Sequence, residues 1–239
     1  AAQGCHGVVH LVGIIKESAS SSFEAAHEGT TRVVVAAAEQ AGSKHLVYLS
    51  ILGSRPDAGN ACLASKGRAE QIIEGSEVSS LILRVPMVLG EGDYATRALA
   101  GRARSRLAFQ FRADSLEQPI YAGDVLAAVL KGLGLEGEGV SGSFDLAGPE
   151  SLSRRALTHR AAEVLGTPLP SVISLPIGLG MALAGLLERL SANPPFTRAM
   201  LGVLDHDDLI DPGPALAALG LVLTPLNDAL RLCLEDRSG

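Results

Sequence analysis

Aromatic residues are scarce in this chain, and tryptophan is absent. Only 3% of the 239 residues are aromatic, whereas 47% are hydrophobic, so the sequence predicts a sizeable core built from Ala, Leu, Val and Ile. Basic residues are also in the minority, and the net charge is −6. A nucleic-acid partner is therefore not expected, because such proteins normally present a basic face.

The one basic cluster comprises Arg102, Arg104 and Arg106. It is short and has no aromatic residues between its arginines. We interpret it as a solvated helix face, with contact to an anionic ligand as the minor alternative.

Cysteine is rare as well, and the three cysteines show no metal-site or disulfide spacing. They are Cys5, Cys62 and Cys233. The histidines His10, His27 and His45 are dispersed, so we expect structural histidines and no metal site. No signal-peptide pattern is present at the N-terminus, and we expect a cytoplasmic location.

A long uncharged segment at residues 164–187 raises the question of a membrane span. Pro168, Pro170 and Pro176 interrupt it, and the remaining helical part at 177–190 is too short to cross a hydrocarbon core of about 30 Å. The pattern favours a buried or interface helix. Contact of residues 171–190 with a protein partner or with a membrane surface stays open as an alternative.

Strand and helix patterns alternate in the first half of the chain. Strands are predicted at 7–13, 44–50 and 80–84, with helices at 23–40 and 61–74 between them. This order is typical of right-handed βαβ units and a parallel sheet.

The alternation loosens after a turn at 90–92. A helix is predicted at 124–132, a strand at 142–146 and a helix at 151–165 with Ser151 as its cap; mostly helical sequence follows. The sequence therefore predicts an α/β protein. A Rossmann-like doubly wound parallel sheet would occupy residues 1–149, and a smaller, mostly helical C-terminal lobe would occupy residues 150–239.

A glycine-rich phosphate loop is missing where such a sheet normally has one, since only seven residues precede Val8. Residues 171–185 resemble a strand, a Gly178-x-Gly180 turn and a helix. Pro176 interrupts that strand, and no second strand is predicted after the helix. We prefer small residues for close helix packing over a cofactor loop.

Several short motifs follow one another in a characteristic order. They are HLVG at 10–13, HEGTTRV at 27–33, HLVYLSILG at 45–53, LASK at 63–66 with Glu70, ILRVPMVLGEGD at 82–93, QPIYAGDV at 118–125, DLAGPE at 145–150, NPPFT at 193–197 and LGLVLTPL at 219–226. In this order the chain resembles the extended or atypical short-chain dehydrogenase/reductases. It is most similar to the branch that contains the dehydrogenase-like accessory subunit of respiratory complex I.

The resemblance implies an NAD or NADP cofactor in the intact parent protein. Family members begin with a strand and a G-x-x-G-x-x-G loop, and we expect this chain to lack that first third. The residues that would distinguish NAD from NADP belong to the same missing part.

The resemblance also implies a catalytic pair, because family enzymes use Tyr-x-x-x-Lys. The lysine lowers the pKa of the tyrosine, which then acts as a base. Lys66 matches the lysine, as a cofactor ligand or alternatively as a solvated helix residue, but Cys62 occupies the tyrosine position. A thiol is a poor replacement for the phenol. Cys62 is then either a reactive thiolate or an idle cysteine.

Further positions follow from the resemblance, and ordinary strand ends and turns are the alternative at each. The implied cofactor contacts are Leu11, Val12 and Gly13 after the first strand, Leu49 and Ser50 at the end of the second, and Val85, Pro86 and Met87 after the third. The implied substrate contacts are Gln118 and Tyr121. For Asp124 we favour a helix N-cap over acid–base chemistry.

Two functional hypotheses from different classes remain. The chain belongs either to an NAD(P)-dependent oxidoreductase or nucleotide-sugar epimerase/dehydratase, or to a cofactor-binding protein with little turnover whose surface serves a partner. Cys62 in place of tyrosine favours the second hypothesis.

Overall fold

The computed structural model describes residues 2–18, 20–135, 137–191, 194–203 and 205–234. Asn193, in the predicted tail motif, lies outside the described residues. The central feature is a parallel sheet with strand order β1-β2-β3-β8. Its strands are β1 (Gly7–His10), β2 (His45–Ile51), β3 (Ser79–Val85) and β8 (Gly142–Asp145).

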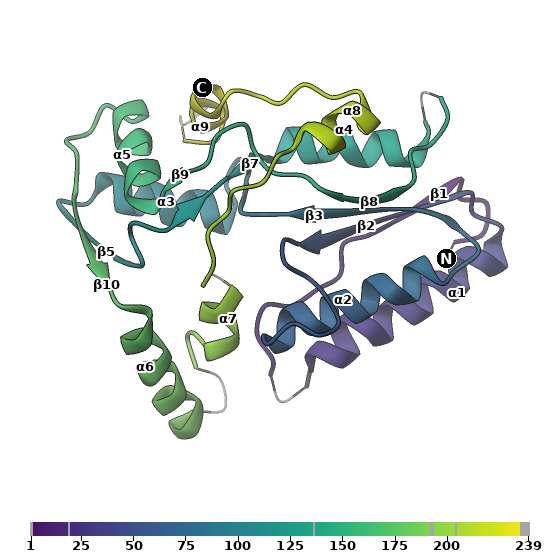
Figure 1. The fold of residues 1–239 in the computed structure, drawn as a ribbon, viewed down its shortest axis with the longest axis horizontal. Coiled ribbons are helices and arrows are strands. Elements are labelled where there is room, and N and C mark those ends of the chain that lie inside the picture. Colours follow the sequence, from purple (N-terminus) through teal and green to yellow (C-terminus); the bar gives the residue numbers. More distant parts are fainter. Residues whose placement is uncertain (1, 19, 136, 192–193, 204, 235–239) are drawn as a thin grey trace.

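Helices cover both faces of this sheet (Figure 1). The π-helical turn η1 (Glu24–Gly29), α1 (Thr30–Ala41) and α2 (Ala61–Glu74) lie on one face, and α4 (Ala122–Leu133) and α8 (Gly213–Leu219) lie on the other. The predicted fold class, a Rossmann-like doubly wound parallel sheet, is confirmed.

The sheet is apolar because its central strands are buried on both faces, as parallel strands usually are. Leu46 and Tyr48 of β2 pack towards α1 and α2, whereas Val47 packs towards α4. All three side chains are fully buried. The helix α4 sits close to the strands because Gly132 leaves no side chain between them. A Cβ there would lie 2.5 Å from Leu81 Cδ2 and 2.8 Å from Val47 Cγ2.

The predicted helices have identifiable ends. The Asn60 side chain caps α2 by accepting hydrogen bonds from the backbone N–H groups of Cys62 and Leu63. Gly42 ends α1 in the left-handed conformation with φ 65°, which glycine adopts without steric cost. Both ends agree with the sequence prediction, although the first helix begins with a π-helical turn.

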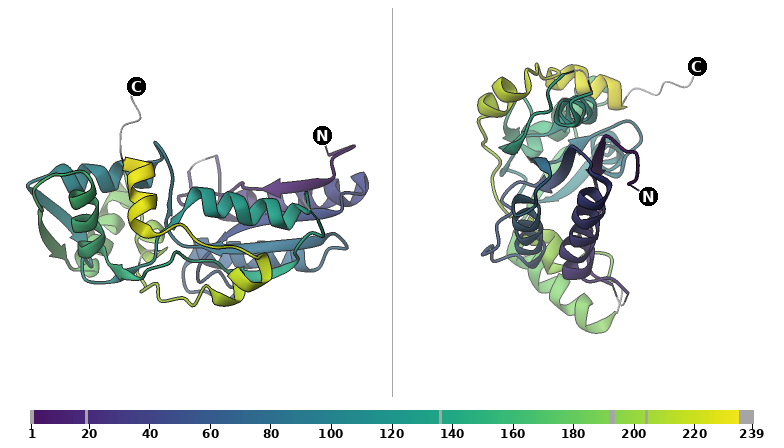
Figure 2. Two further views of the ribbon diagram at one scale, coloured as in Figure 1. Left: turned by 90° about the horizontal axis from the view of Figure 1, so that it is seen from above. Right: turned by 90° about the vertical axis from the view of Figure 1, so that its right-hand side faces the viewer.

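A second lobe lies beside the sheet (Figure 2). It is formed by α3 (Tyr94–Arg104), β5 (Leu107–Phe111), α5 (Arg154–Val164), β10 (Ser171–Leu175), α6 (Ile177–Leu190), α7 (Arg198–Val203) and α9 (Leu226–Leu234). Two short strand pairs connect the lobe to the sheet: β4 (Val88–Leu89) with β7 (Ile120–Tyr121), and β6 (Leu116–Glu117) with β9 (Leu152–Ser153).

No single point in the sequence separates the sheet core from the lobe core. The lobe core joins α3 to α5 and α9, while α8 returns to pack on the sheet core. Segments on both sides of the predicted 149/150 boundary therefore contribute to both units, and that boundary stays a prediction.

Pro176 does not interrupt the strand before it, contrary to the sequence interpretation. The strand β10 ends at Leu175 and pairs in parallel with β5, which was not predicted, and Pro176 is the N-cap of α6. Gly178 and Gly180, the two glycines of the loop-like pattern at 171–185, both lie inside α6. A Cβ on Gly180 would lie 2.8 Å from Phe111, so the close-packing interpretation is confirmed there.

Two predicted helix caps are wrong. Ser153, not Ser151, caps α5 by accepting from the Ala156 N–H, because β9 delays the start of the helix. The helix α4 begins earlier than predicted, directly after β7, so Asp124 lies within its first turn. The Asp124 carboxylate instead accepts from the backbone N–H and hydroxyl of Thr224, at 2.9 and 2.8 Å.

The basic cluster is only partly a solvated face. Arg104 and Arg106 are exposed, but Arg102 is half-buried near Glu117, and burial lowers its pKa. Among the described residues, no helix combines the length and hydropathy that crossing a bilayer requires.

The close approach of α4 to the sheet predicts a cost for Gly132→Ala. Overpacking the contact should destabilise the protein by about 1–3 kcal/mol in urea unfolding. Gly101→Ala is the matched control, since it lies in α3 and a Cβ there meets nothing within 4 Å. It should be neutral or stabilising by up to about 1 kcal/mol. Equal effects of the two substitutions would contradict this account.

Candidate functional site

The carboxyl ends of β1, β2 and β3 meet at one edge of the sheet, where open α/β sheets bind ligands. The predicted cofactor residues lie there. Leu11, Val12 and Gly13 directly follow β1, Leu49 and Ser50 lie near the end of β2, and Val85, Pro86 and Met87 form the end of β3 and the turn after it.

Lys66 reaches into this edge from α2. Its side chain is buried, and Nζ donates to the Leu49 carbonyl oxygen at 2.9 Å. Nζ also lies 4.4 Å from the centroid of the Tyr48 ring, a cation–π geometry. A Cβ on Gly13 would lie 3.1 Å from Nζ. The structure thus brings Gly13, Leu49 and Lys66 together, and the solvated-lysine alternative is wrong.

Burial in this position changes the acidity of Lys66. Desolvation lowers the pKa of its ammonium group to about 8, and the nearby Glu70 only partly opposes the shift. Glu70 is itself committed to Arg84, whose Nη2 lies 2.7 Å from a Glu70 carboxylate oxygen. Lys66 is therefore mostly charged at neutral pH without a carboxylate of its own.

The surroundings of Cys62 favour an idle cysteine over a reactive thiolate, and its role stays a prediction. It is fully buried, and its Sγ donates weakly to the Ile14 carbonyl oxygen at 3.6 Å. Burial raises the pKa of the thiol to about 11, and the opposing effect of Lys66 is smaller. The thiolate fraction at neutral pH is consequently negligible.

Two buried histidines, His10 and His27, lie near Lys66 at this edge of the sheet. His10 Nε2 lies 2.9 Å from Thr31 Oγ1 and its ring stacks on Tyr48, while His27 Nε2 lies 3.1 Å from the Ile14 backbone nitrogen. Burial and the charge of Lys66 lower the pKa of both histidines to about 4. They are neutral at physiological pH, as expected for structural histidines. The described residues hold no cluster suited to a metal ion.

At this edge of the sheet, one polar group has no hydrogen-bond partner and two apolar side chains are exposed. The Ser50 hydroxyl is buried and has no hydrogen-bond partner among the described residues. Leu11 and Val12 are 61% and 50% exposed, so they are not an ordinary buried strand end. An orphaned hydroxyl, an ammonium group and an exposed apolar strand end fit a ligand that has both hydroxyls and a flat ring.

The segment after β3 is engaged through its backbone. The carbonyl oxygen of Val85 accepts from the Leu52 N–H at 3.2 Å, and that of Met87 accepts from the Ile120 N–H at 3.0 Å. The side chains of Pro86 and Met87 are half-buried. Their predicted contact with a nicotinamide ring stays a prediction.

The two predicted substrate residues, Gln118 and Tyr121, differ in how far their polar atoms are already engaged within the protein. Both amide hydrogens of Gln118 are donated to backbone carbonyls, those of Gly148 and Ile210, and its Oε1 accepts from the Ile210 N–H. The Gln118 amide is therefore engaged within the protein, and its predicted substrate contact stays a prediction. Tyr121 is partly exposed, and its hydroxyl donates to Glu91 at 2.9 Å.

The lobe closes the edge over Cys62, which the sequence does not indicate. Asn60 Nδ2 donates to the Ala199 carbonyl oxygen of α7 at 2.9 Å, and a Cβ on Gly202 would lie 2.6 Å from that nitrogen. Val203 of α7 joins Cys62 in one apolar cluster. A cavity of about 260 Å³ remains beside this contact, with Phe23 and Thr197 among its lining residues.

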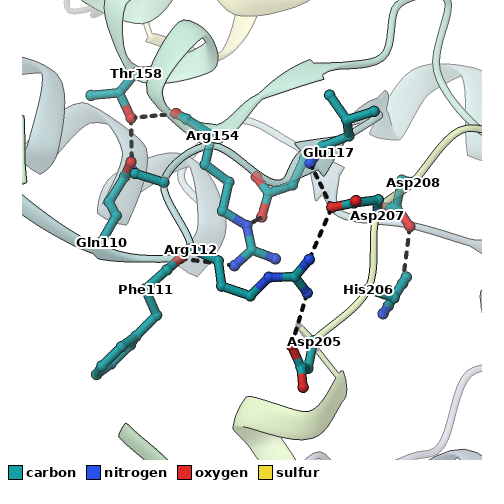
Figure 3. A network of polar contacts seen from close by, with 12 residues as sticks. Gln110, Phe111, Arg112, Glu117, Arg154, Thr158, Asp205, His206, Asp207 and Asp208 are labelled. Carbon is teal, nitrogen blue, oxygen red and sulfur yellow. Dashed lines mark hydrogen bonds and ion pairs between the residues drawn. The ribbon is translucent and has the colours of Figure 1, made fainter. Parts of the chain in front are cut away.

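Ion pairs that the sequence analysis missed hold the segment at 205–210 to the lobe (Figure 3). Arg112, with a left-handed φ of 49°, pairs with Asp205 at 2.8 Å and with Asp207 at 3.3 Å. Nearby, Arg154 pairs with the buried Glu117 at 2.8 Å. Asp and Arg residues in separate parts of a sequence give no signal of such pairing.

The parallel sheet, the helices on both of its faces and the second lobe define the fold class, a Rossmann-like doubly wound sheet with an added lobe. No protein-family profile matches the chain. Among curated proteins it is 24% identical over 205 residues to NADH dehydrogenase [ubiquinone] 1 alpha subcomplex subunit 9, mitochondrial, of Arabidopsis thaliana, covering 79% of this chain and 48% of that protein. It is 30% identical over 98 residues to ceramide reductase of Caulobacter vibrioides, covering 41% and 31%.

Solved structures show the same fold. The Bordetella bronchiseptica enzyme WbmG, in complex with NAD and UDP, matches with a TM-score of 0.69 and 17% identity over 96% of this chain and 71% of that chain. UDP-N-acetylglucosamine 4-epimerase of Bacillus cereus matches with a TM-score of 0.67 and 16% identity, covering 95% and 76%. The resemblance predicted from the motifs is confirmed. The chain spans half or less of the length of the curated relatives it matches.

The covered thiol leads to a labelling prediction in a Cys5→Ser, Cys233→Ser background. With Ellman's reagent at pH 8, Cys62 should react more than about a hundredfold slower than an exposed thiol, because few thiolates form and α7 covers them. The rate should rise with pH up to about 11.

Gly202→Ala should accelerate this labelling by displacing α7 from Asn60. Gly178→Ala is the matched control, since a Cβ there meets nothing within 4 Å. Rapid labelling of the unaltered protein at neutral pH would refute the covered, protonated state of Cys62.

Proposed function

We propose that the intact protein binds NAD(H) or NADP(H) at the carboxyl ends of β1, β2 and β3 and turns it over weakly or not at all. The observation that carries the proposal is the buried ammonium group of Lys66 between Gly13 and Leu49, beside a thiol that α7 covers. The NAD complexes of structurally similar proteins support the choice of ligand.

The residues present could hold such a cofactor in a simple way. The Lys66 ammonium group would donate to a ribose hydroxyl, since its bond to Leu49 uses only one of three hydrogens. Ser50 would supply a second polar contact, and Gly13 leaves room for the close approach. The cofactor itself would supply the hydride chemistry.

The thiol and the phenol nearest to Lys66 are poorly matched, as proton donors, to that chemistry. The Cys62 thiol holds its proton up to about pH 11, and its Sγ points at the Ile14 carbonyl. The Tyr48 hydroxyl is fully buried, and burial raises its pKa above the ordinary value. A general acid or base works best when its pKa lies near the operating pH, and neither group meets that condition.

An NAD(P)-dependent oxidoreductase or nucleotide-sugar epimerase/dehydratase is the second candidate. The observation in its favour is the fold shared with sugar-nucleotide epimerases, including a lobe that closes over the strand ends. Such an activity would need a proton donor other than Cys62 and Tyr48.

We also propose a cytoplasmic protein in which residues 171–190 face a partner or a membrane surface. The support is the apolar sequence of α6 and its sparse burial: only Gly180 and Ala184 are buried in that helix. This docking function is independent of cofactor binding.

The test of the cofactor proposal is a fluorescence titration of the intact gene product with NADH and NADPH. Lys66→Met, which keeps the packing on Tyr48 but removes the charge, should weaken binding about 10- to 100-fold, the usual value of a charged hydrogen bond. Lys44→Met is the control, because Lys44 is exposed at the opposite end of β2. Absence of saturable binding by the unaltered protein would refute the proposal.

The pH dependence of this titration is a separate prediction. The bound cofactor needs the charged ammonium group, whose pKa is about 8 in the unliganded protein. Affinity should therefore be constant below that pH and fall as the pH rises above 8. The Lys66→Met variant should bind weakly at every pH. An affinity that does not change between pH 7 and pH 10 would remove Lys66 from the binding site.

A further inference from the structure

The two-stranded sheet of the lobe has one covered face and one open face. Its inner face packs on α5, where Gln110 Nε2 donates to Thr158 Oγ1 at 2.8 Å and Ala108 is buried. Because successive side chains of a strand point to opposite faces, Leu107 and Phe109 point outwards. They are 44% and 58% exposed, and Ile173, in register with Phe109, is 42% exposed.

The open face continues onto α6. The strand β10 leads directly into this helix, and Phe111, two residues beyond Phe109, packs against Gly180. Four leucines follow at intervals of four, three and four residues, which places them on one side of the helix. They are Leu179, Leu183, Leu186 and Leu190, with exposures from 44% to 74%. We call these four leucines with Leu107, Phe109 and Ile173 the lobe strip.

The lobe strip is uncharged along its length and basic at both ends. No charged residue occurs in β5 or in residues 171–187. Arg104 and Arg106 are exposed just before β5, and Arg189 lies at the far end of α6; none of the three has an ion-pair partner among the described residues. Glu188, the acid nearest this end, is paired with Arg198 at 2.9 Å. Figure 1 shows β10 and α6 following one another away from the sheet.

The size of the strip is that of a functional surface. Large apolar side chains present roughly 200 Å² each when free, so these seven expose on the order of 700 Å². That is more than a monomer normally leaves open in one patch, and such patches mark interaction sites.

The arginines at both ends of the lobe strip favour one of two possible binding partners, a second copy of the chain or a bilayer surface. A second copy of the chain would pair strip against strip, and either orientation would bring an arginine end against another arginine end. A bilayer with anionic lipids avoids this conflict, since its headgroups are negative along the whole contact while the apolar side chains enter the headgroup–acyl boundary. The arginines at the two ends of the lobe strip thus form local basic sites on a chain whose overall net charge is −6.

We propose that the lobe strip docks the protein on the surface of a bilayer that contains anionic lipids. The inference deepens the docking part of the proposed function and rests on it, but not on cofactor binding. The strip lies on the surface and does not cross the bilayer.

The test is co-sedimentation of the full chain with vesicles of phosphatidylcholine alone or mixed with phosphatidylglycerol. Binding is expected with the mixed vesicles, weakly or not at all with the neutral ones, and it should fall as salt rises. Replacing Arg104, Arg106 and Arg189 by Gln should lower the partition coefficient roughly a hundredfold, at about fivefold for each arginine. Replacing Arg32, Arg55 and Arg231, which are exposed but ion-paired, is the matched control and should leave binding unchanged.

The apolar contribution is tested with Phe109→Ser and Leu183→Ser. Because both side chains are exposed, these substitutions should leave thermal unfolding unchanged. Both should abolish vesicle binding. Equal binding to neutral and anionic vesicles, no effect of these variants, or a dimer in light scattering that Leu183→Ser dissociates would each overturn the proposal. The NADPH titration should be unaltered in both variants, so failure of docking and failure of cofactor binding remain distinguishable.

Discussion

The buried ammonium group of Lys66 is the interaction on which the arrangement of the strand ends depends. It joins α2 to β2 through the Leu49 carbonyl, lies over the Tyr48 ring and leaves little room for a side chain at Gly13. A buried charge must be compensated, and here a carbonyl dipole and an aromatic ring provide the compensation in place of a carboxylate. Burial, reinforced by the same charge, keeps His10 and His27 neutral.

The fold could be predicted because its signals are local. Apolar runs and a glycine after α1 mark the strands and a helix end, and βαβ order then fixes the parallel sheet. The position of Lys66 relative to Cys62 was likewise visible, since four residues on a helix share one face.

The rest of the site could not be predicted, because it depends on contacts between distant segments. Asn60 meets α7 across 139 residues, and Gln118 bonds to a backbone 92 residues later. Neither contact has a pattern in the local sequence. The short strand β5 was missed for a related reason: its partner, β10, lies some sixty residues along the chain. Asp124 was assigned to its own helix for lack of any sign that Thr224 would reach it.

The segment at 205–210 has a consequence for how such a protein can diverge. Besides the ion pairs of Arg112, its own backbone groups hold it: Asp208 N–H donates to the Leu116 carbonyl, Ser151 to the Asp208 carbonyl, and Gln118 bonds to both the N–H and the carbonyl of Ile210. Contacts of this kind specify the path of the chain rather than the identity of the side chains along it. The lobe can therefore exchange its outward side chains over evolutionary time while keeping its position beside the sheet, so one Rossmann-like frame can carry many different outer surfaces.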